Sequence, residues 1–262
     1  MNLLEKQHIK VNGLLGDATD YSICDITIKK LIVWFLMGFV ISGIVIYIFY
    51  ENIILSVVLG AIGGLAFIPI RKKQVIKKRK KNLLSQFKDM LDAVSTSIGA
   101  GKNIYDSFIA AKSDLLIQYS PEADIVSEVD FIVHGINNNI QVEDLLMNFA
   151  ERSQLDDVRN FAGVFSTCYE KGGNIKDVIR STTTVISDKI DVQMELETMV
   201  AGQKNEQNIM MVMPVVFVLL MKFMGGGLID LSSVMGIVSV TISIVIFIIA
   251  YFISKKILDI KL

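Results

Sequence analysis

The stretch from residue 31 to residue 81 decides the fold class. It reads LIVWFLMGFVISGIVIYIFY (31–50), EN (51–52), IILSVVLGAIGGLAFIPI (53–70) and RKKQVIKKRKK (71–81). The two long runs contain no Asp, Glu, Lys or Arg, and both approach or reach the length of about 20 apolar residues that spans a bilayer. The segment after them carries eight basic residues and no acid. This order predicts a transmembrane hairpin that returns to a basic cytoplasmic segment.

Two further runs repeat this signal towards the end of the chain. Residues 209–221 and 231–253 also lack acidic and basic side chains. The first of them is short, but Lys222 can extend its ammonium group to the interface and let Phe223 and Met224 lengthen the span. With 52% hydrophobic residues among 262 and a mean hydropathy of +0.51, the chain is too apolar for an ordinary soluble domain. We therefore expect a membrane protein with four transmembrane helices.

Basic residues that flank these runs predict their orientation. Lys29 and Lys30 precede the first run, Lys255 and Lys256 follow the fourth, and the loop at 225–230 has no basic residue. We expect a multi-pass protein of the cell (plasma or inner) membrane, with both termini and the main domain in the cytoplasm. Because no small-residue cleavage site follows the first run, we expect that run to be retained.

The predicted organisation has five parts. They are a cytoplasmic N-terminal segment (1–30), a transmembrane hairpin (31–70), a cytoplasmic helical domain with a basic start (71–208), a second transmembrane hairpin (209–254) and a cytoplasmic tail (255–262). The basic start would attract anionic membrane lipid with about 1 kcal/mol per Lys or Arg, which favours lipid over nucleic acid as its partner. Residues 82–208 carry 10 basic and 20 acidic side chains. This acidic part is either a solvated surface or a docking face for a basic partner.

Helices are expected throughout the cytoplasmic domain. Apolar residues recur at three- and four-residue spacing in six stretches, at 83–98, 104–116, 125–136, 142–149, 158–168 and 175–190. No long run of alternating β-branched residues supports a strand there. The predicted fold class is therefore an all-α membrane protein: four transmembrane helices, with a cytoplasmic antiparallel six-helix bundle between spans two and three.

One long helix should connect this bundle with the third span. No Gly or Pro occurs from Ile175 up to Gly202, and apolar residues keep the helical spacing through Val200. Pro214 then falls inside the third span, where it removes a backbone hydrogen bond. We expect ordinary packing to account for this proline, or a membrane hinge if the protein moves.

The segment GAGKN at 99–103 resembles part of a phosphate-binding loop but does not fit the full pattern. With Gly101 and Lys102 as the Gly-Lys pair of G-x-x-x-x-G-K-[ST], the first glycine falls on Thr96 and the Mg²⁺-binding hydroxyl on Asn103. The residues before it also have the spacing of a helix rather than a strand. Another role must account for Gly101.

Two later segments share the pattern of this turn. GKNIYDSF (101–108), NIQVEDLL (139–146) and GGNIKDVI (172–179) each have a Gly or Asn, a polar residue two positions later, an apolar residue next and an acid close behind. Gly, and less readily Asn, adopts the left-handed conformation that ends a helix. The members of this helix-corner motif are Gly101, Asn103, Asp106, Asn139, Glu143, Gly172, Gly173, Asn174 and Asp177.

The side chains of the motif fit the start of the next helix. Asn103 and Asn174 are predicted N-caps, and Asp106 and Asp177 occupy the third helical position, where a negative charge favours the helix dipole. We interpret the repeat as a structural motif that ends one helix and starts the next. Partner binding by the exposed turns is the alternative.

The sequence offers no catalytic set, and we expect no enzymatic activity, metal or cofactor. Cys24, Cys168, His8 and His134 are isolated from one another, whereas metal sites need clustered ligands. No Ser or Thr has a His and an acid at usable spacing, and no glycine-rich loop follows a strand.

These motifs, in this order, resemble the type II secretion system F domain family. The first turn matches at Ala100, Gly101, Ile104, Ser107 and Phe108, the second at Val142, Glu143, Leu146, Ala150 and Arg152, and the third at Gly172, Gly173, Ile175, Val178 and Ile179. Asn139 and Leu145 stand where the family usually has Gly and Ala. The resemblance covers about residues 83–224, and the layout is most similar to the platform proteins of Tad-type (tight adherence, Flp) pili (TadB/TadC-like).

The resemblance implies a non-enzymatic platform of a pilus or type II-like secretion machine. Its expected partners are a hexameric secretion ATPase, pilin subunits, membrane lipid, and a second F-domain platform protein or a further copy of itself, with no nucleic acid. The platform would couple the ATPase to pilin extraction and assembly. As candidate contacts with the ATPase or another partner we select charges expected to be exposed in turns, namely Glu151, Arg152, Glu170 and Lys171.

Two other classes of function remain open on the sequence. A membrane-anchored helical signalling or regulatory scaffold would bind a different partner. A small transporter would need a polar path through the spans, whereas Gln203, Asn205 and Asn208 lie at the expected membrane edge.

Overall fold

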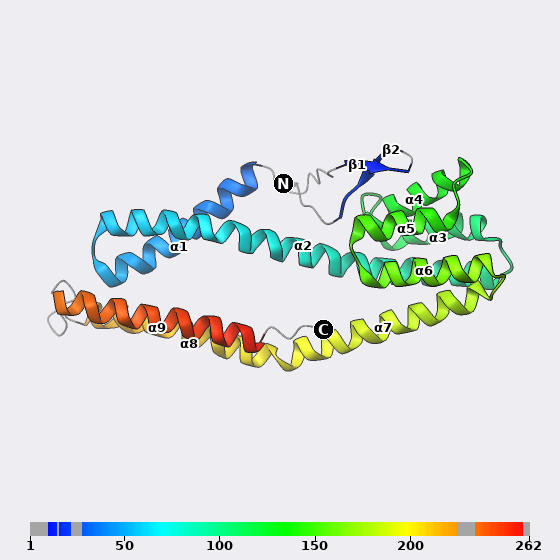
Figure 1. Ribbon diagram of the computed structural model, residues 1–262. Helices are drawn as coiled ribbons and strands as arrows, with labels where there is room; N and C mark the ends of the chain where they lie inside the picture. Colours follow the sequence, from blue (N-terminus) through cyan, green and yellow to red (C-terminus); the bar gives the residue numbers. More distant parts are fainter. Residues whose placement is uncertain (1–9, 15, 22–27, 225–233, 259–262) are drawn as a thin grey trace. The chain divides into compact units, whose positions relative to one another are not determined.

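The computed structural model describes residues 10–14, 16–21, 28–224 and 234–258 (Figure 1). Apart from one short β-hairpin, the regular structure in this part of the chain is α-helical. The chain forms two compact units. We call Met1–Asp25 with Lys72–Asp191 the helical unit, and Ile26–Arg71 with Val192–Leu262 the membrane unit.

Four helices are long and apolar enough to cross a membrane, so the prediction of a helical, multi-pass membrane protein is confirmed at this level. They contain α1 (Ile28–Tyr50), the first part of α2 (Ile53–Gly99), α8 (Ala201–Phe223) and α9 (Val234–Leu258). The loop predicted at 225–230 and the first three residues of the fourth predicted span lie outside the described residues.

Helices α1 and α2 pack closely because small residues face each other. A Cβ atom added to Gly38 would lie 2.7 Å from Phe67 Cβ, and one added to Gly60 would lie 3.3 Å from Gly43 Cα. Ser42 Oγ donates to Gly38 O at 2.6 Å or to Gly60 O at 3.2 Å. Small residues and a shared hydroxyl are the usual means of helix association in a membrane, where burial of apolar surface gives little driving force.

Polar contacts join α8 and α9 to this hairpin. Lys222 Nζ lies 2.7 Å from Glu51 Oε1 and also donates to Ile48 O at 2.5 Å. The hydroxyls of Tyr50 and Thr241 are 2.9 Å apart. The end of α8 therefore lies beside the turn between α1 and α2, and Lys222 forms an ion pair with Glu51 there.

The helical unit consists of the second part of α2, four complete helices and most of α7. The complete helices are α3 (Ile104–Gln118), α4 (Asp124–Asn137), α5 (Val142–Ser153) and α6 (Asp156–Glu170), and α7 is Ile175–Met199. All six predicted helical stretches fall within these helices. The first is not a separate helix, however, because α2 continues from the second span through Pro69 and the basic segment to Gly99.

One hydrophobic core joins all of these helices. It contains a series of aromatic contacts with ring centroids 5.6 to 5.9 Å apart, which runs from the buried Tyr21 through Phe149, Phe87, Phe161 and Phe165 to the exposed Tyr169. Ile179 and Ile186 of α7 are buried against the same core. The apolar faces predicted from helical spacing therefore share one interior.

Helices α7 and α8 follow each other with a short interruption at Val200. Val200 N donates to Leu196 O at 3.0 Å, and Lys204 N donates to Val200 O at 2.9 Å. The helical hydrogen-bond pattern thus continues past the interruption, which lies two residues before Gly202. Pro214 lies inside α8.

An unexpected β-hairpin precedes α1. Strands β1 (Lys10–Gly13) and β2 (Gly16–Thr19) pair antiparallel, with Lys10 opposite Thr19 and Gly13 opposite Gly16. The chain then reaches Tyr21, which is buried in the core of the helical unit. Part of the predicted N-terminal segment is therefore a component of this unit.

Candidate partner interface

Three corners with the same backbone geometry end α2, α4 and α6. Gly101, Asn139 and Gly172 have left-handed φ angles of 89°, 60° and 70°. A Cβ atom added to Gly101 or Gly172 would meet nothing within 4 Å. These two positions therefore require glycine for backbone conformation rather than for space.

Each corner closes with the same pair of hydrogen bonds. The left-handed residue donates to the carbonyl three positions earlier: Gly101 to Ile98 at 2.9 Å, Asn139 to Ile136 at 3.0 Å and Gly172 to Tyr169 at 3.4 Å. The next residue donates to the carbonyl five positions earlier: Lys102 to Ser97 at 3.2 Å, Ile140 to Gly135 at 3.0 Å and Gly173 to Cys168 at 2.8 Å. This is the Schellman motif, so the sequence repeat encodes one backbone structure three times.

The following helices start three residues after each left-handed position, and their N-caps differ. Asn103 Oδ1 accepts from Asp106 N at 2.8 Å, whereas Asn174 Oδ1 is 3.4 Å from Asp177 N. Gln141 is the N-cap residue of α5 but its side chain makes no capping hydrogen bond, and Glu143 adds an acid to the first turn of that helix. The shared element is the end of the preceding helix, and the N-cap varies.

The three corners lie at one end of the helical unit, which we call the distal end. Tyr105 Oη donates to Asn137 Oδ1 at 2.7 Å and so links the first corner with the second. A Cβ atom added to Gly99 would lie 3.3 Å from Lys176 Nζ, so the third corner adjoins the first. The turns that carry the motif are the alternate turns of the helical unit, those before α3, α5 and α7.

The other turns of the unit lie beside an earlier part of α2, and we call this the proximal end. Arg79 Nε and Nη2 donate to the two carboxylate oxygens of Asp124, each at 3.0 Å. Lys80 Nζ lies 3.3 Å from Gln154 Oε1 and 3.4 Å from Gln154 O. Part of the basic segment therefore holds the turns before α4 and α6 onto α2.

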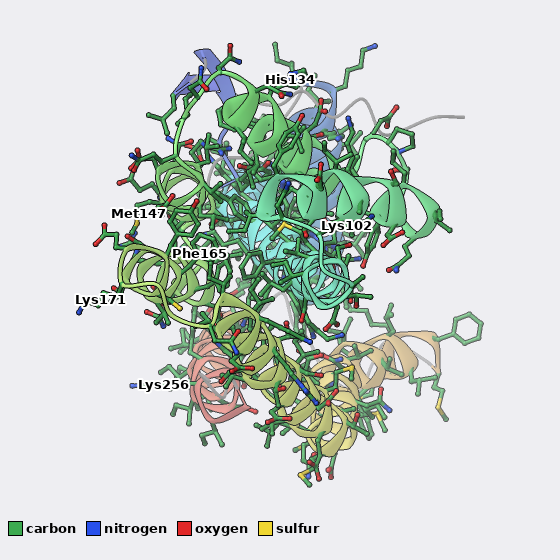
Figure 2. All side chains as sticks on the ribbon, turned by 90° about the vertical axis from the view of Figure 1, so that its right-hand side faces the viewer. Lys102, His134, Met147, Phe165, Lys171 and Lys256 are labelled. Atoms are coloured by element: carbon green, nitrogen blue, oxygen red, sulfur yellow. The ribbon has the colours of Figure 1, made fainter. Side chains whose placement is uncertain are left out.

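The four predicted contact charges do not form one surface. Glu170 and Lys171 are exposed at the distal end, and Lys171 extends away from the ribbon in Figure 2. Glu151 is exposed near the C-terminus of α5, close to the turn that Lys80 contacts. Arg152 was expected to be exposed, and this prediction is wrong, because only 7% of the residue is accessible.

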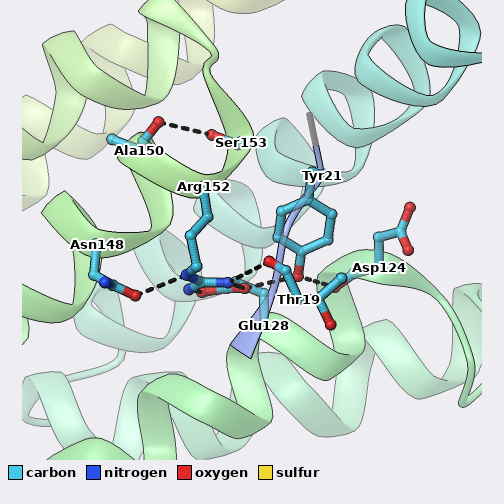
Figure 3. A network of polar contacts seen from close by, with 8 residues as sticks. All are labelled: Thr19, Tyr21, Asp124, Glu128, Asn148, Ala150, Arg152 and Ser153. Carbon is cyan, nitrogen blue, oxygen red and sulfur yellow. Dashed lines mark hydrogen bonds and ion pairs between the residues drawn. The ribbon is translucent and has the colours of Figure 1, made fainter. Parts of the chain in front are cut away.

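Arg152 is instead the centre of a buried polar network (Figure 3). Its Nη1 donates to Glu128 Oε2 at 2.8 Å and to Thr19 O at 3.0 Å, and its Nη2 contacts Glu128 Oε1. Its Nε donates to Asn148 Oδ1 at 2.7 Å. The guanidinium also lies over the Phe131 ring, 5.0 Å from the centroid.

Tyr21 completes this network from the N-terminal segment. Its hydroxyl donates to Glu128 Oε2 at 2.7 Å, and its backbone N donates to Arg152 O at 3.1 Å. Burial raises the pKa of Tyr21 well above 10.0, and the charge of Glu128 raises it further. Burial alone would lower the pKa of Arg152, but the hydrogen bonds and charge of Glu128 raise it. Arg152 therefore stays charged in this network, and the phenol of Tyr21 stays neutral.

One residue of this network could be recognised from the sequence. Glu128 shares the apolar face of α4 with Ile125, Val129 and Ile132, so its carboxylate must enter the core and needs a cationic partner there. Nothing in the spacing indicates that the partner is Arg152 or that Tyr21 joins them, because both are distant in sequence.

In the membrane unit, a groove of about 860 Å³ lies between α8 and α9. Pro214, the predicted hinge, lines it together with Met210, Met211 and Phe247. Gln207 Nε2 is buried there and has no hydrogen-bond partner among the described residues.

Among the described residues, no group of three or more His, Cys, Asp or Glu side chains could hold a metal ion. His134 is exposed and lies 3.8 Å from Asp130, and Cys168 is a free thiol. Cys24 and His8 lie outside the described residues. Comparisons with protein-family models, with curated proteins and with solved structures find no match for this chain.

Proposed function

We propose that the chain is a platform protein of a Tad-type pilus or a type II-like secretion machine in the cell membrane. In this role it couples a hexameric cytoplasmic ATPase to the extraction and assembly of pilin subunits. The observation that carries the proposal is the set of three matched corners at the distal end of the helical unit. They coincide with the three turns on which the resemblance to the F domain family rests.

The charges at the ends of the membrane helices support a cytoplasmic helical unit. Lys29 and Lys30 are near the start of α1, and Arg71, Lys72 and Lys73 follow the apolar part of α2. At the other end of the hairpin, Lys222 is paired with Glu51. An excess of Lys and Arg in the flanking segments favours the cytoplasmic side, so we place the termini and the helical unit there.

Two long helices provide the mechanical connection in this proposal. From Ile70 to Gly99, α2 rises about 43 Å at 1.5 Å per residue, and α7 leads into α8. A displacement of the distal end would reach the membrane spans through these helices. Pro214 and the groove beside it would be the hinge, and a second platform protein or a further copy would complete the assembly.

Site-specific cross-linking to the ATPase tests the proposal. Single cysteines at Lys102 and Lys171 probe the distal end, and one at Glu151 is the matched exposed position away from it, with Cys24 and Cys168 replaced by Ser. With the secretion ATPase co-expressed in membranes, we expect cross-links from the two distal positions and none from Glu151.

Two other outcomes have clear meanings. Cross-links from Glu151 alone would keep the ATPase but exclude the distal end as its contact. No cross-link or co-purification with any candidate ATPase would contradict the platform role and favour the membrane-anchored signalling scaffold.

A further inference from the structure

The eight basic residues at 71–81 have different contacts. Arg79 is bound by Asp124 through two hydrogen bonds, and its guanidinium lies 5.2 Å from the Tyr21 ring centroid. Arg71 lies over the Phe67 ring at 4.9 Å, and Lys80 contacts Gln154. Lys77 and Lys81 also have interactions in the structure. These residues have partners within the protein.

Lys72, Lys73 and Lys78 form the remaining set. All three are exposed, and none has an ion-pair or hydrogen-bond partner in the part of the chain that the structure describes. The segment 71–81 contains no acidic residue, so no neighbour along the helix compensates their charge. They are therefore available to an external anion.

The position of these lysines along α2 indicates which anion they meet. Lys72 and Lys78 lie about 3 Å and 12 Å along the helix axis beyond Ile70, the last residue of the apolar run. The headgroup layer extends about 5 to 8 Å beyond the hydrocarbon on each side of a bilayer. The backbones of Lys72 and Lys73 thus lie within that layer. The backbone of Lys78 lies within one Debye length of the headgroup layer, roughly 8 Å in physiological salt, and its flexible side chain can extend towards the headgroups.

We propose that Lys72, Lys73 and Lys78, which lie on different sides of α2, together form a binding surface around the helix for the phosphate groups of anionic phospholipids. Arg79 and Lys80 instead hold the proximal end of the helical unit onto α2. One basic segment thus has two functions, and the contacts of each residue decide which one it serves. The inference rests on the membrane topology of the proposed function and is independent of the ATPase.

Lipid selectivity of the full-length protein tests this surface. The protein is reconstituted in phosphatidylcholine bilayers, and the association of spin-labelled phosphatidylglycerol is compared with that of spin-labelled phosphatidylcholine. We expect the protein to prefer phosphatidylglycerol. The triple variant Lys72→Gln, Lys73→Gln, Lys78→Gln should lose roughly fivefold or more of that preference, the equivalent of at least one Lys contact.

The matched control removes the same charge from the distal end. Lys102, Lys171 and Lys176 are exposed, and their triple Gln variant should keep the full preference for phosphatidylglycerol. Inorganic phosphate at matched ionic strength should also leave the preference unchanged, because the surface recognises phosphate at the bilayer. An equal loss in both triple variants would overturn the proposal, since general charge would then explain the selectivity.

Two further measurements separate the alternatives. The first is the binding of a labelled single-stranded oligonucleotide. If the parent protein binds it, the 72/73/78 variant does not, and both proteins have the same preference for phosphatidylglycerol, then the surface binds nucleic acid and the proposal is wrong. The cross-link from a cysteine at Lys171 to the ATPase should persist in the 72/73/78 variant. Failure of the lipid proposal therefore leaves the platform proposal standing, and loss of the ATPase cross-link leaves the lipid proposal standing.

Discussion

The contribution of the Arg152–Glu128 ion pair to stability depends on its burial. Glu128 is 1% and Arg152 7% accessible, so neither charge has water as an alternative partner. Replacing Arg152 with Met should reduce the free energy of unfolding by about 3 to 5 kcal/mol, because the Glu128 carboxylate would remain buried without a counter-charge. Chemical denaturation of the purified protein in detergent measures this change.

The double variant Arg152→Met, Glu128→Leu is the control for this prediction. Because both charges are removed together, the double variant should be more stable than the Arg152→Met single variant. Additive losses would contradict the interpretation that the pair acts as a unit.

Gly101 offers a second prediction at the scale of one residue. Gly101→Ala should lower the free energy of unfolding by about 1 to 2 kcal/mol, since its φ of 89° is costly for any residue with a Cβ atom. Gly163 is the matched control, because it also has open space around its missing Cβ but lies inside α6. Gly163→Ala should stabilise the protein by about 0.5 to 1 kcal/mol. Similar effects at both sites would refute the conformational argument.

Tyr119 should make stability depend on pH in the alkaline range. Burial and the hydrogen bond to Asp89 raise its pKa from 10.0 to about 12. The unfolded chain therefore releases the phenol proton first, so this contribution is complete below pH 10 and is lost as the pH rises from 10 to 12. The free energy of unfolding of Tyr119→Phe should fall less over this range than that of the parent protein. Parallel curves would show that Tyr119 has no such role.

At the scale of the element, the α1–α2 hairpin depends on the distance between its helices. Gly38→Ala should disrupt it, because the new Cβ would lie 2.7 Å from Phe67 Cβ and 3.0 Å from the backbone of Gly64. Gly43 is the control on the same helix, with its nearest neighbour at 3.8 Å. We expect a clear drop in the thermal stability of the detergent-solubilised protein for Gly38→Ala and little change for Gly43→Ala. Equal effects would mean that close packing at Gly38 does not hold the hairpin.

Helix α2 is one continuous element, although local sequence patterns predicted three separate parts. The sequence suggested a span, a basic segment and a bundle helix, because composition changes twice between Ile53 and Gly99. Lys and Arg are good helix formers, and no glycine occurs between Pro69 and Gly99 to end the helix. A change in the environment of a helix does not require a break in its backbone.

At the scale of the whole molecule, the proposed orientation predicts which positions reagents can reach. In a background without Cys24 and Cys168, a cysteine at Asn52 should react with a membrane-impermeant maleimide on intact cells. A cysteine at Lys171 should react only after the membrane is permeabilised. The opposite pattern would invert the topology and remove the basis for a cytoplasmic ATPase as partner.

The sequence by itself determined the elements that depend on local physics. Four apolar runs, six amphipathic stretches and three left-handed corners could be identified because hydrophobic period, helix propensity and glycine conformation act over a few residues. The Schellman geometry at Gly101, Asn139 and Gly172 follows from the same local rules.

Only the tertiary structure decided which residues meet. It brought the three corners to one end, buried Arg152 against Glu128, added Tyr21 from the N-terminal segment and divided the basic segment into paired and exposed residues. These outcomes depend on contacts between residues far apart in the chain. A local pattern shows that Arg152 carries a charge, but its burial depends on which helices pack around it.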